Sequence, residues 1–226
     1  MTRLFSLLTM ALFVTISVDA QNIAERLRNR GSIAKTKQDV ARDKEELSAF
    51  TRKLDSFYSH VKSQDIGGAN ILIPELASAM RQEIIQLEEK VKRAEAEERS
   101  SRREVGSDRR ELRRNRSNDE DTYKNVGDRR DKRDDRRDLR DDREDTATYE
   151  SLLSEAKSLL GRVEGYRLSE RVVDAELHGS KVRALESFRN IMIEDLKLSG
   201  EEIREDKKEA GEDRRETRED RRERSR

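Results

Sequence analysis

The sequence predicts an all-α protein made of tandem long helical hairpins, which form an elongated antiparallel four-helix bundle or coiled coil with charged helical extensions. Three observations support this fold class. Apolar residues recur at alternating three- and four-residue steps over long stretches. Charged residues make up 44% of the 226-residue chain, with 50 basic against 50 acidic side chains, and such interleaved charge favours long helices. One proline and no cysteine are present, so packing alone must hold the fold.

Residues 1–20 have the features of a secretory signal peptide. Arg3 supplies a positive start, residues 4–18 form an apolar run that is short for a membrane span, and Ala20 ends a small-residue cleavage site. An uncleaved signal anchor is the alternative. We expect residues 21–226 to be soluble and exported, either to the periplasm or to the medium, without a stable membrane anchor.

The first predicted hairpin repeat covers residues 21–116. Its first long helix starts at Ser32 and ends before Gly67-Gly68, a pair that is typical of a turn. Pro74 is expected in the first turn of the second helix, where its missing N–H costs nothing. The seam of the first helix has polar residues at Thr36 and Asp43 between the apolar positions Ile33, Val40, Leu47, Phe50, Leu54, Phe57 and Val61.

The second helix of this repeat changes character along its length. Its seam is apolar from Leu76 to Ala94 and then thins to Glu98, Ser101, Val105, Asp108 and Leu112. Its surface becomes rich in arginine over residues 99–116, and a polar linker, residues 117–127, follows. We therefore expect an apolar half that packs and a charged half that projects.

The second predicted repeat covers residues 128–226 and includes a charged C-terminal tail. One helix is expected over residues 128–163, ended by Gly165, and a further helix is expected to start near Ser180. The first of these helices opens with two acidic heptads. Its seam is carboxylate in the first half and apolar in the second, through Tyr149, Leu152, Ala156, Leu159 and Val163.

The two repeats are similar to each other, which indicates an internal duplication. Shifting residues 79–113 by 105 positions onto residues 184–218 gives 12 identities in 35 positions without a gap. The first helices match at a shift of 102 positions, where their apolar seams coincide. Biased composition inflates such matches, but the shared glycine at Gly106 and Gly211 and the coincident seams are harder to obtain by bias.

The acidic seam is the sharpest functional candidate in the sequence. Like charges three and four residues apart repel along an isolated helix, so the arrangement favours a basic partner helix. We expect an interaction seam either within the chain or with a partner chain, formed by Asp128, Asp131, Asp135, Asp138 and Asp142 with Arg102, Arg109 and Arg113. The alternative is a solvated charged helix or a disordered tether, because exposed ion pairs contribute at most about 1 kcal/mol each.

Catalytic and cofactor chemistry are not indicated. His60 and His178 are the only histidines, and neither has a second histidine or cysteine at metal-ligand spacing. The acidic clusters lack the ligand spacing of a calcium loop, and no glycine-rich phosphate loop is present. We predict no enzyme activity, no cofactor, no metal and no small-molecule substrate. A net charge of zero argues against nucleic acid as a partner.

The predicted function is that of a non-catalytic exported structural or protein-interaction module, which binds a protein partner or itself through coiled-coil contacts. In architecture alone it resembles periplasmic chaperones that cradle unfolded chains, although the Leu-Thr-x-x-Gln motif of one such group is absent. The alternative function is therefore a periplasmic holdase for envelope proteins. It would need an exposed apolar surface, for which residues 71–73 and 166–177 are the candidates.

Overall fold

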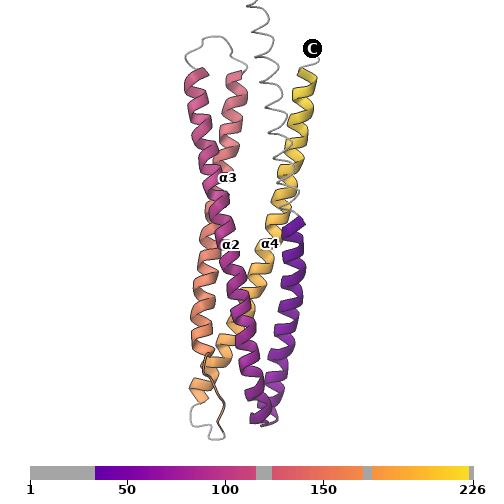
Figure 1. Cartoon of the computed structure of the whole chain (residues 1–226), viewed down its shortest axis with the longest axis vertical. Coiled ribbons are helices and arrows are strands. Elements are labelled where there is room, and N and C mark those ends of the chain that lie inside the picture. The colour runs from indigo at the N-terminus through magenta and orange to yellow at the C-terminus, as the bar shows by residue number, and fades with distance from the viewer. Residues whose placement is uncertain (1–33, 116–123, 170–174, 224–226) are drawn as a thin grey trace, which may run out of the picture. The chain divides into compact units, whose positions relative to one another are not determined.

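The computed structural model describes residues 34–115, 124–169 and 175–223, and within these residues it contains long helices and no strand (Figure 1). The helices are residues 34–62, α2 (Ile66–Asn115), α3 (Lys124–Val163) and α4 (Ala175–Glu223). The predicted all-α class is confirmed. The signal peptide predicted for residues 1–20 lies outside the described residues, and α3 begins before the predicted end of the linker at residue 127.

The chain divides into two compact units, residues 1–47 with 196–226, and residues 48–195. In the first unit, the described part consists of residues 34–47 and the second half of α4. In the second unit, all four helices contribute. The units therefore cut across the predicted hairpins, and the division into two repeats stays a prediction.

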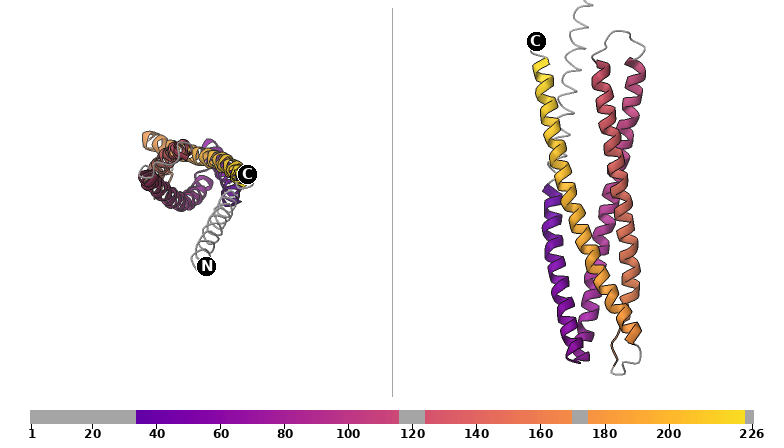
Figure 2. Two further views of the ribbon diagram at one scale, coloured as in Figure 1. Left: turned by 90° about the horizontal axis from the view of Figure 1, so that it is seen from above. Right: turned by 180° about the vertical axis from the view of Figure 1, so that it is seen from behind.

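The core of unit 48–195 is built from the apolar seams of its helices. In this unit α2 and α3 run side by side in opposite directions, as both Figure 1 and the right panel of Figure 2 show. Phe50 packs its ring on Phe188 of α4, with ring centroids 5.8 Å apart. The largest fully buried apolar side chains of the unit are those of Phe50, Leu54, Phe57, Leu76, Met80, Leu87, Val163, Leu185 and Phe188.

The start of α2 differs from the sequence prediction. The helix begins at Ile66 and includes the glycine pair, because Asp65 caps it: Asp65 Oδ1 accepts a hydrogen bond from the Gly68 N–H at 2.9 Å. Pro74 consequently lies inside α2 and not in its first turn. Gly68 serves a close approach and not a turn, since a Cβ there would lie 2.3 Å from His60 Nδ1.

The end of α3 agrees with the prediction, whereas the start of α4 does not. Gly165 follows α3 with a φ of 71°, a left-handed conformation that glycine adopts without strain. α4 begins at Ala175, ahead of the predicted cap Ser180. The Ser180 hydroxyl instead accepts a hydrogen bond from Arg162 Nη2 at 3.2 Å, so it links α4 to α3.

Charged and polar residues also occupy buried positions. Thr36 and Asp43 are 3% exposed, which agrees with their predicted places on the seam of the first helix. In unit 48–195, Lys90 Nζ of α2 lies 2.5 Å from Asp195 Oδ2 of α4, and the two side chains are 4% and 2% exposed. A buried charge is tolerated only when it is paired, and here each side chain neutralises the other.

Candidate functional site

The predicted interaction seam is only partly on the packed side of α3. Asp135 and Asp142 are half-buried and Asp138 is exposed, while the side chains of Asp128 and Asp131 lie outside the described residues. Leu139, next to Asp138, is buried at 9% exposure, and the part of Asp138 in an interaction seam stays a prediction. Neighbouring residues lie about 100° apart around an α-helix, so Leu139 and Asp138 cannot both face the packed side. Packing Leu139 instead of Asp138 buries apolar area.

Asp142 of the predicted seam contacts α2. Ser101 Oγ donates a hydrogen bond to Asp142 Oδ2 at 2.5 Å. Burial raises the pKa of the Asp142 carboxyl, the charges of Asp141 and Glu98 add to the increase, and the Ser101 hydrogen bond opposes it. The partner of this carboxylate is thus a neutral hydroxyl and not the arginine that the sequence suggested.

An ion pair between the helices lies one turn away, with its charges reversed relative to the prediction. Arg143 Nε of α3 donates to Glu98 Oε1 of α2 at 3.2 Å. Glu98 Oε1 also accepts a hydrogen bond from Arg102 Nη2 of its own helix at 2.5 Å. The hydrogen bond from Arg143, with a further contribution from Arg102, lowers the pKa of the Glu98 carboxyl.

The remaining predicted arginines lie on the surface of α2. Arg109 and Arg113 are exposed, and the acids proposed to meet them, Asp128 and Asp131, have no described side chains. Their pairing stays a prediction. Sequence reasoning placed Glu98 and Ser101 on the seam of the second helix but missed their partner Arg143, because the arginines of residues 128–145 are too numerous for periodicity to single one out.

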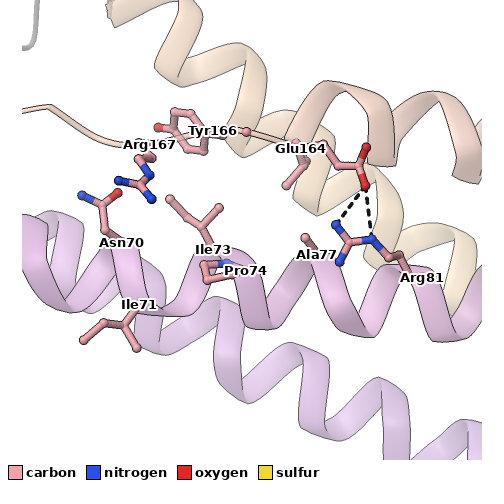
Figure 3. Close-up of a pocket in the computed structure, with 11 residues that line it drawn as sticks. Asn70, Ile71, Ile73, Pro74, Ala77, Arg81, Glu164, Tyr166 and Arg167 are labelled. Atoms are coloured by element: carbon pink, nitrogen blue, oxygen red, sulfur yellow. Dashed lines mark hydrogen bonds and ion pairs between the residues drawn. The ribbon is translucent and has the colours of Figure 1, made fainter.

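A cavity of about 440 Å³ lies between the start of α2 and the segment that follows α3, within unit 48–195 (Figure 3). Ile73 and Asn70 point toward the segment that carries Tyr166 and Arg167. Ile71 is the most exposed large apolar side chain of the described residues, at 65%. The lining residues are Asn70, Ile71, Ile73, Pro74, Ala77, Arg81, Val163, Glu164, Gly165, Tyr166 and Arg167.

Hydrogen bonds hold both ends of this cavity. Asn70 Nδ2 donates to the Leu168 carbonyl at 3.0 Å, and the Leu168 N–H donates to Asn70 Oδ1 at 2.8 Å. Arg81 donates from Nε and Nη2 to Glu164 Oε1 at 3.2 and 2.9 Å (Figure 3). Burial raises the pKa of the Tyr166 hydroxyl. The cavity combines an apolar wall with polar groups, which suits a segment of polypeptide.

The histidine in the described residues serves the turn before α2. His60 Nδ1 lies 2.8 Å from Asp65 Oδ2, so the ring is held by the capping carboxylate. The ring therefore fixes the geometry between the first helix and α2, while the side chain of His178 lies outside the described residues.

The part of the chain that the structure describes contains neither a membrane-spanning helix nor a cluster of metal ligands. No helix there is long and apolar enough to cross a membrane. No group of three or more His, Cys, Asp or Glu side chains is placed there to hold a metal ion. Comparison with protein-family models, with curated proteins and with solved structures finds no match to this chain.

Proposed function

We propose that this chain is a non-catalytic, exported interaction module, in which apolar seams join the helices and charged extensions pair with each other or with a second copy of the chain. The observation that carries the proposal is the polar contact zone between α2 and α3. There, Glu98 meets Arg143 at 3.2 Å and Ser101 meets Asp142 at 2.5 Å.

The contact zone supports recognition between helices because its groups are directional and only partly desolvated. In the register of α2 against α3 that is found, each contact joins a donor on one helix to an acceptor on the other, and the two contacts have opposite polarity. Exposed charges continue beyond it, including Arg109, Arg113, Asp138 and Arg140. These side chains are accessible to a further helix, and pairing through them would weaken as salt increases.

Export is part of the proposal and is supported by the sequence of residues 1–20. A positive start, an apolar run and a small-residue site are the features that secretion machinery recognises. The periplasm or the medium is therefore the proposed location. Fractionation of cells that produce the full chain, with determination of the mature N-terminus, tests it; an unprocessed chain in the cytoplasm would contradict it.

Sedimentation of the purified chain over a salt series tests the interaction. We expect a mass above that of one chain at low salt, and a decrease toward the single-chain mass at about 0.5 M salt, where charges are screened beyond a few ångströms. The variant Arg109→Glu with Arg113→Glu should reduce the mass at low salt. Lys53→Glu is the matched control, because Lys53 forms a partly exposed ion pair with Glu75 inside unit 48–195. A single-chain mass at every salt concentration would exclude self-association.

A holdase function is the second candidate, and one observation favours it. Ile71, which is 65% exposed, and Tyr166 both line the cavity, and they belong to the two apolar segments that this function would need. The chain should then slow the aggregation of an unfolded client protein, and Ile71→Asp should reduce the effect. Ile193→Asp, at a residue that is 47% exposed and does not line the cavity, is the matched control. No effect of the wild-type chain at molar excess would remove this candidate.

A further inference from the structure

Lys90 and Asp195 occupy equivalent positions in the two predicted repeats, since they are separated by the 105 residues that relate those repeats. If the duplication is real, other equivalent positions of α2 and α4 should share the same degree of burial. Four further pairs of buried residues have this separation: Met80 with Leu185, Glu83 with Phe188, Leu87 with Met192, and Ala94 with Ser199. The two helices therefore share the phase of their buried seams at these positions, although Ile84 and Val91 are buried while Arg189 and Leu196 are half-buried.

The contact between equivalent residues has a geometric meaning. In a two-fold arrangement, a residue touches its own equivalent only beside the axis of symmetry. Lys90 Nζ and Asp195 Oδ2 are 2.5 Å apart and almost fully buried, which is the contact that two equivalent residues beside such an axis would make. Two copies of the same hairpin packed in this way would place two identical side chains at that point.

We propose that the Lys90–Asp195 ion pair makes each helical hairpin pack against the other hairpin of the chain and not against a copy of itself. The hairpin of residues 34–115 accepts a helical hairpin with a carboxylate at the position of Asp195, and it rejects a second copy of itself. Two buried lysines or two buried aspartates would repel each other in a region that water does not reach. The partner that fits is the hairpin of residues 124–223 of the same chain, and a competing partner would have to supply the same acid.

The choice of a buried ion pair at these two positions, where an apolar pair would fit, is better explained by selection of the partner hairpin than by the stability of the fold. An apolar pair of similar volume in place of a buried ion pair is often as stable or more stable, whereas loss of one partner is strongly destabilising. A single buried polar position is sufficient to fix register and partner in packed helices. The inference goes beyond the proposed function, because it concerns pairing inside the chain and holds whether or not the charged extensions bind a second copy.

Charge exchange in the full chain tests the stability side of the proposal. Lys90→Asp and Asp195→Lys should each lower the thermal midpoint measured by circular dichroism, and the double variant should recover more than half of the loss. Lys90→Met with Asp195→Leu should keep the wild-type midpoint or raise it. The matched control reverses Lys157 and Glu88, an ion pair whose side chains are 52% and 39% exposed, and should shift the midpoint little.

Mixing the two single variants tests partner choice directly. The Lys90→Asp and Asp195→Lys chains are refolded together at about 0.5 M salt, where pairing through the exposed charged extensions is screened. Opposite charges at positions 90 and 195 can then meet only between different chains, so a species of twice the single-chain mass should form. Each variant refolded alone should form much less of it. The proposal is overturned if the mixture contains no more dimer than the separate variants, if the charge-exchanged double variant recovers nothing, or if the Met–Leu variant is as unstable as the single variants.

Discussion

Ser101 on α2 donates a hydrogen bond to Asp142 on α3, with 2.5 Å between the two oxygen atoms. This contact lies beside the ion pair of Glu98 with Arg143. A hydrogen bond from a neutral hydroxyl and an ion pair therefore join the two helices on adjacent turns. The carboxylate of Asp142 is half-buried, and its hydrogen bond from α2 comes from a hydroxyl and not from a cation. Its ionised form is therefore solvated less well than in water, which is why its pKa is raised.

Replacement of Asp142 by asparagine should stabilise the protein at neutral pH. The amide oxygen still accepts the Ser101 hydrogen bond, while the cost of burying a charge near Asp141 and Glu98 is removed. Because the carboxyl is only half-buried, solvent screens its charge and the gain in the free energy of unfolding should stay below about 1 kcal/mol. Thermal unfolding of both proteins at pH 7 measures it.

The pH dependence of this effect follows from the sign of the pKa shift. An acid with a raised pKa in the folded state binds its proton more tightly there, so the stability it contributes is present at low pH and is lost as the pH rises through the folded pKa. The difference between Asp142→Asn and the wild type should therefore shrink on lowering the pH to about 3, below the usual Asp pKa of about 3.9. Asp138→Asn, at an exposed position, is the control; a constant difference across pH contradicts the explanation.

The adjacent glycines at the start of α2 should respond oppositely to alanine. Gly67→Ala should increase the free energy of unfolding by up to about 1 kcal/mol, because alanine favours helix and the new Cβ would lie 3.6 Å from its nearest neighbour, an ordinary contact. At Gly68 the Cβ would lie 2.3 Å from the His60 ring, so the ring must move and lose its contact with Asp65. Chemical denaturation should find Gly68→Ala less stable than Gly67→Ala by about 1 kcal/mol or more.

Removal of the His60 ring provides the control for this pair. In a His60→Ala background the ring no longer obstructs the new methyl group, and Asp65 Oδ2, 2.5 Å from the new Cβ, is the obstacle that stays. Gly68→Ala should therefore cost less stability in this background than in the presence of His60. Equal stability of the two glycine variants in the presence of His60 would show that the close approach has no energetic weight.

The helices were predictable from the sequence because apolar periodicity is a local signal. The seam residues Leu54, Phe57, Met80 and Leu87 recur at helical spacing, and all are buried. The start of α2 was not predictable in the same way. A glycine pair is typical of a turn, but the competing signal, Asp65 as an N-cap, is one residue among many acids and depends on the distance to Gly68 N–H.

The polar contacts of the candidate site were predictable only as positions, not as pairs. Glu98 and Ser101 could be placed on the seam of the second helix, yet their partners depend on the register and rotation of α3. In a segment where every turn offers both arginine and aspartate, many registers satisfy a charge pattern equally well. Tertiary packing at Leu139 and Val105, 9% and 7% exposed, accompanies the register found here.

The capping carboxylate Asp65 should make the protein less stable in acid. The Gly68 N–H and then His60 lower the pKa of Asp65, so the stability it contributes is present above the unfolded pKa and is lost as the pH falls through the folded pKa. Asp65→Ala should lower the thermal midpoint at pH 7 and converge with the wild type near pH 2. Asp65→Asn keeps an acceptor for Gly68 and is the control; equal midpoints of Asp65→Ala and wild type at pH 7 would contradict the role of the cap.

Asn70 should control the segment that closes one end of the cavity. Its side chain forms a reciprocal pair of hydrogen bonds with the backbone of Leu168, at 3.0 and 2.8 Å, and the segment between Val163 and Leu168 has left the helix. Asn70→Ala removes both bonds, and the free energy of unfolding should fall by about 1 to 2 kcal/mol. Amide hydrogen exchange gives the sharper measurement, because the Leu168 N–H loses its acceptor and should exchange at least about tenfold faster.

Asn70→Asp separates the two bonds and completes this test. A carboxylate still accepts from the Leu168 N–H but has no proton to donate to the Leu168 carbonyl. Protection of the Leu168 amide should therefore survive in Asn70→Asp while stability falls, whereas both are lost in Asn70→Ala. If Leu168 stays protected in the alanine variant, the segment is held by packing around Tyr166 and not by Asn70. In that case the cavity wall is rigid without its polar clamp, and the aggregation assay of the holdase candidate should be insensitive to residue 70.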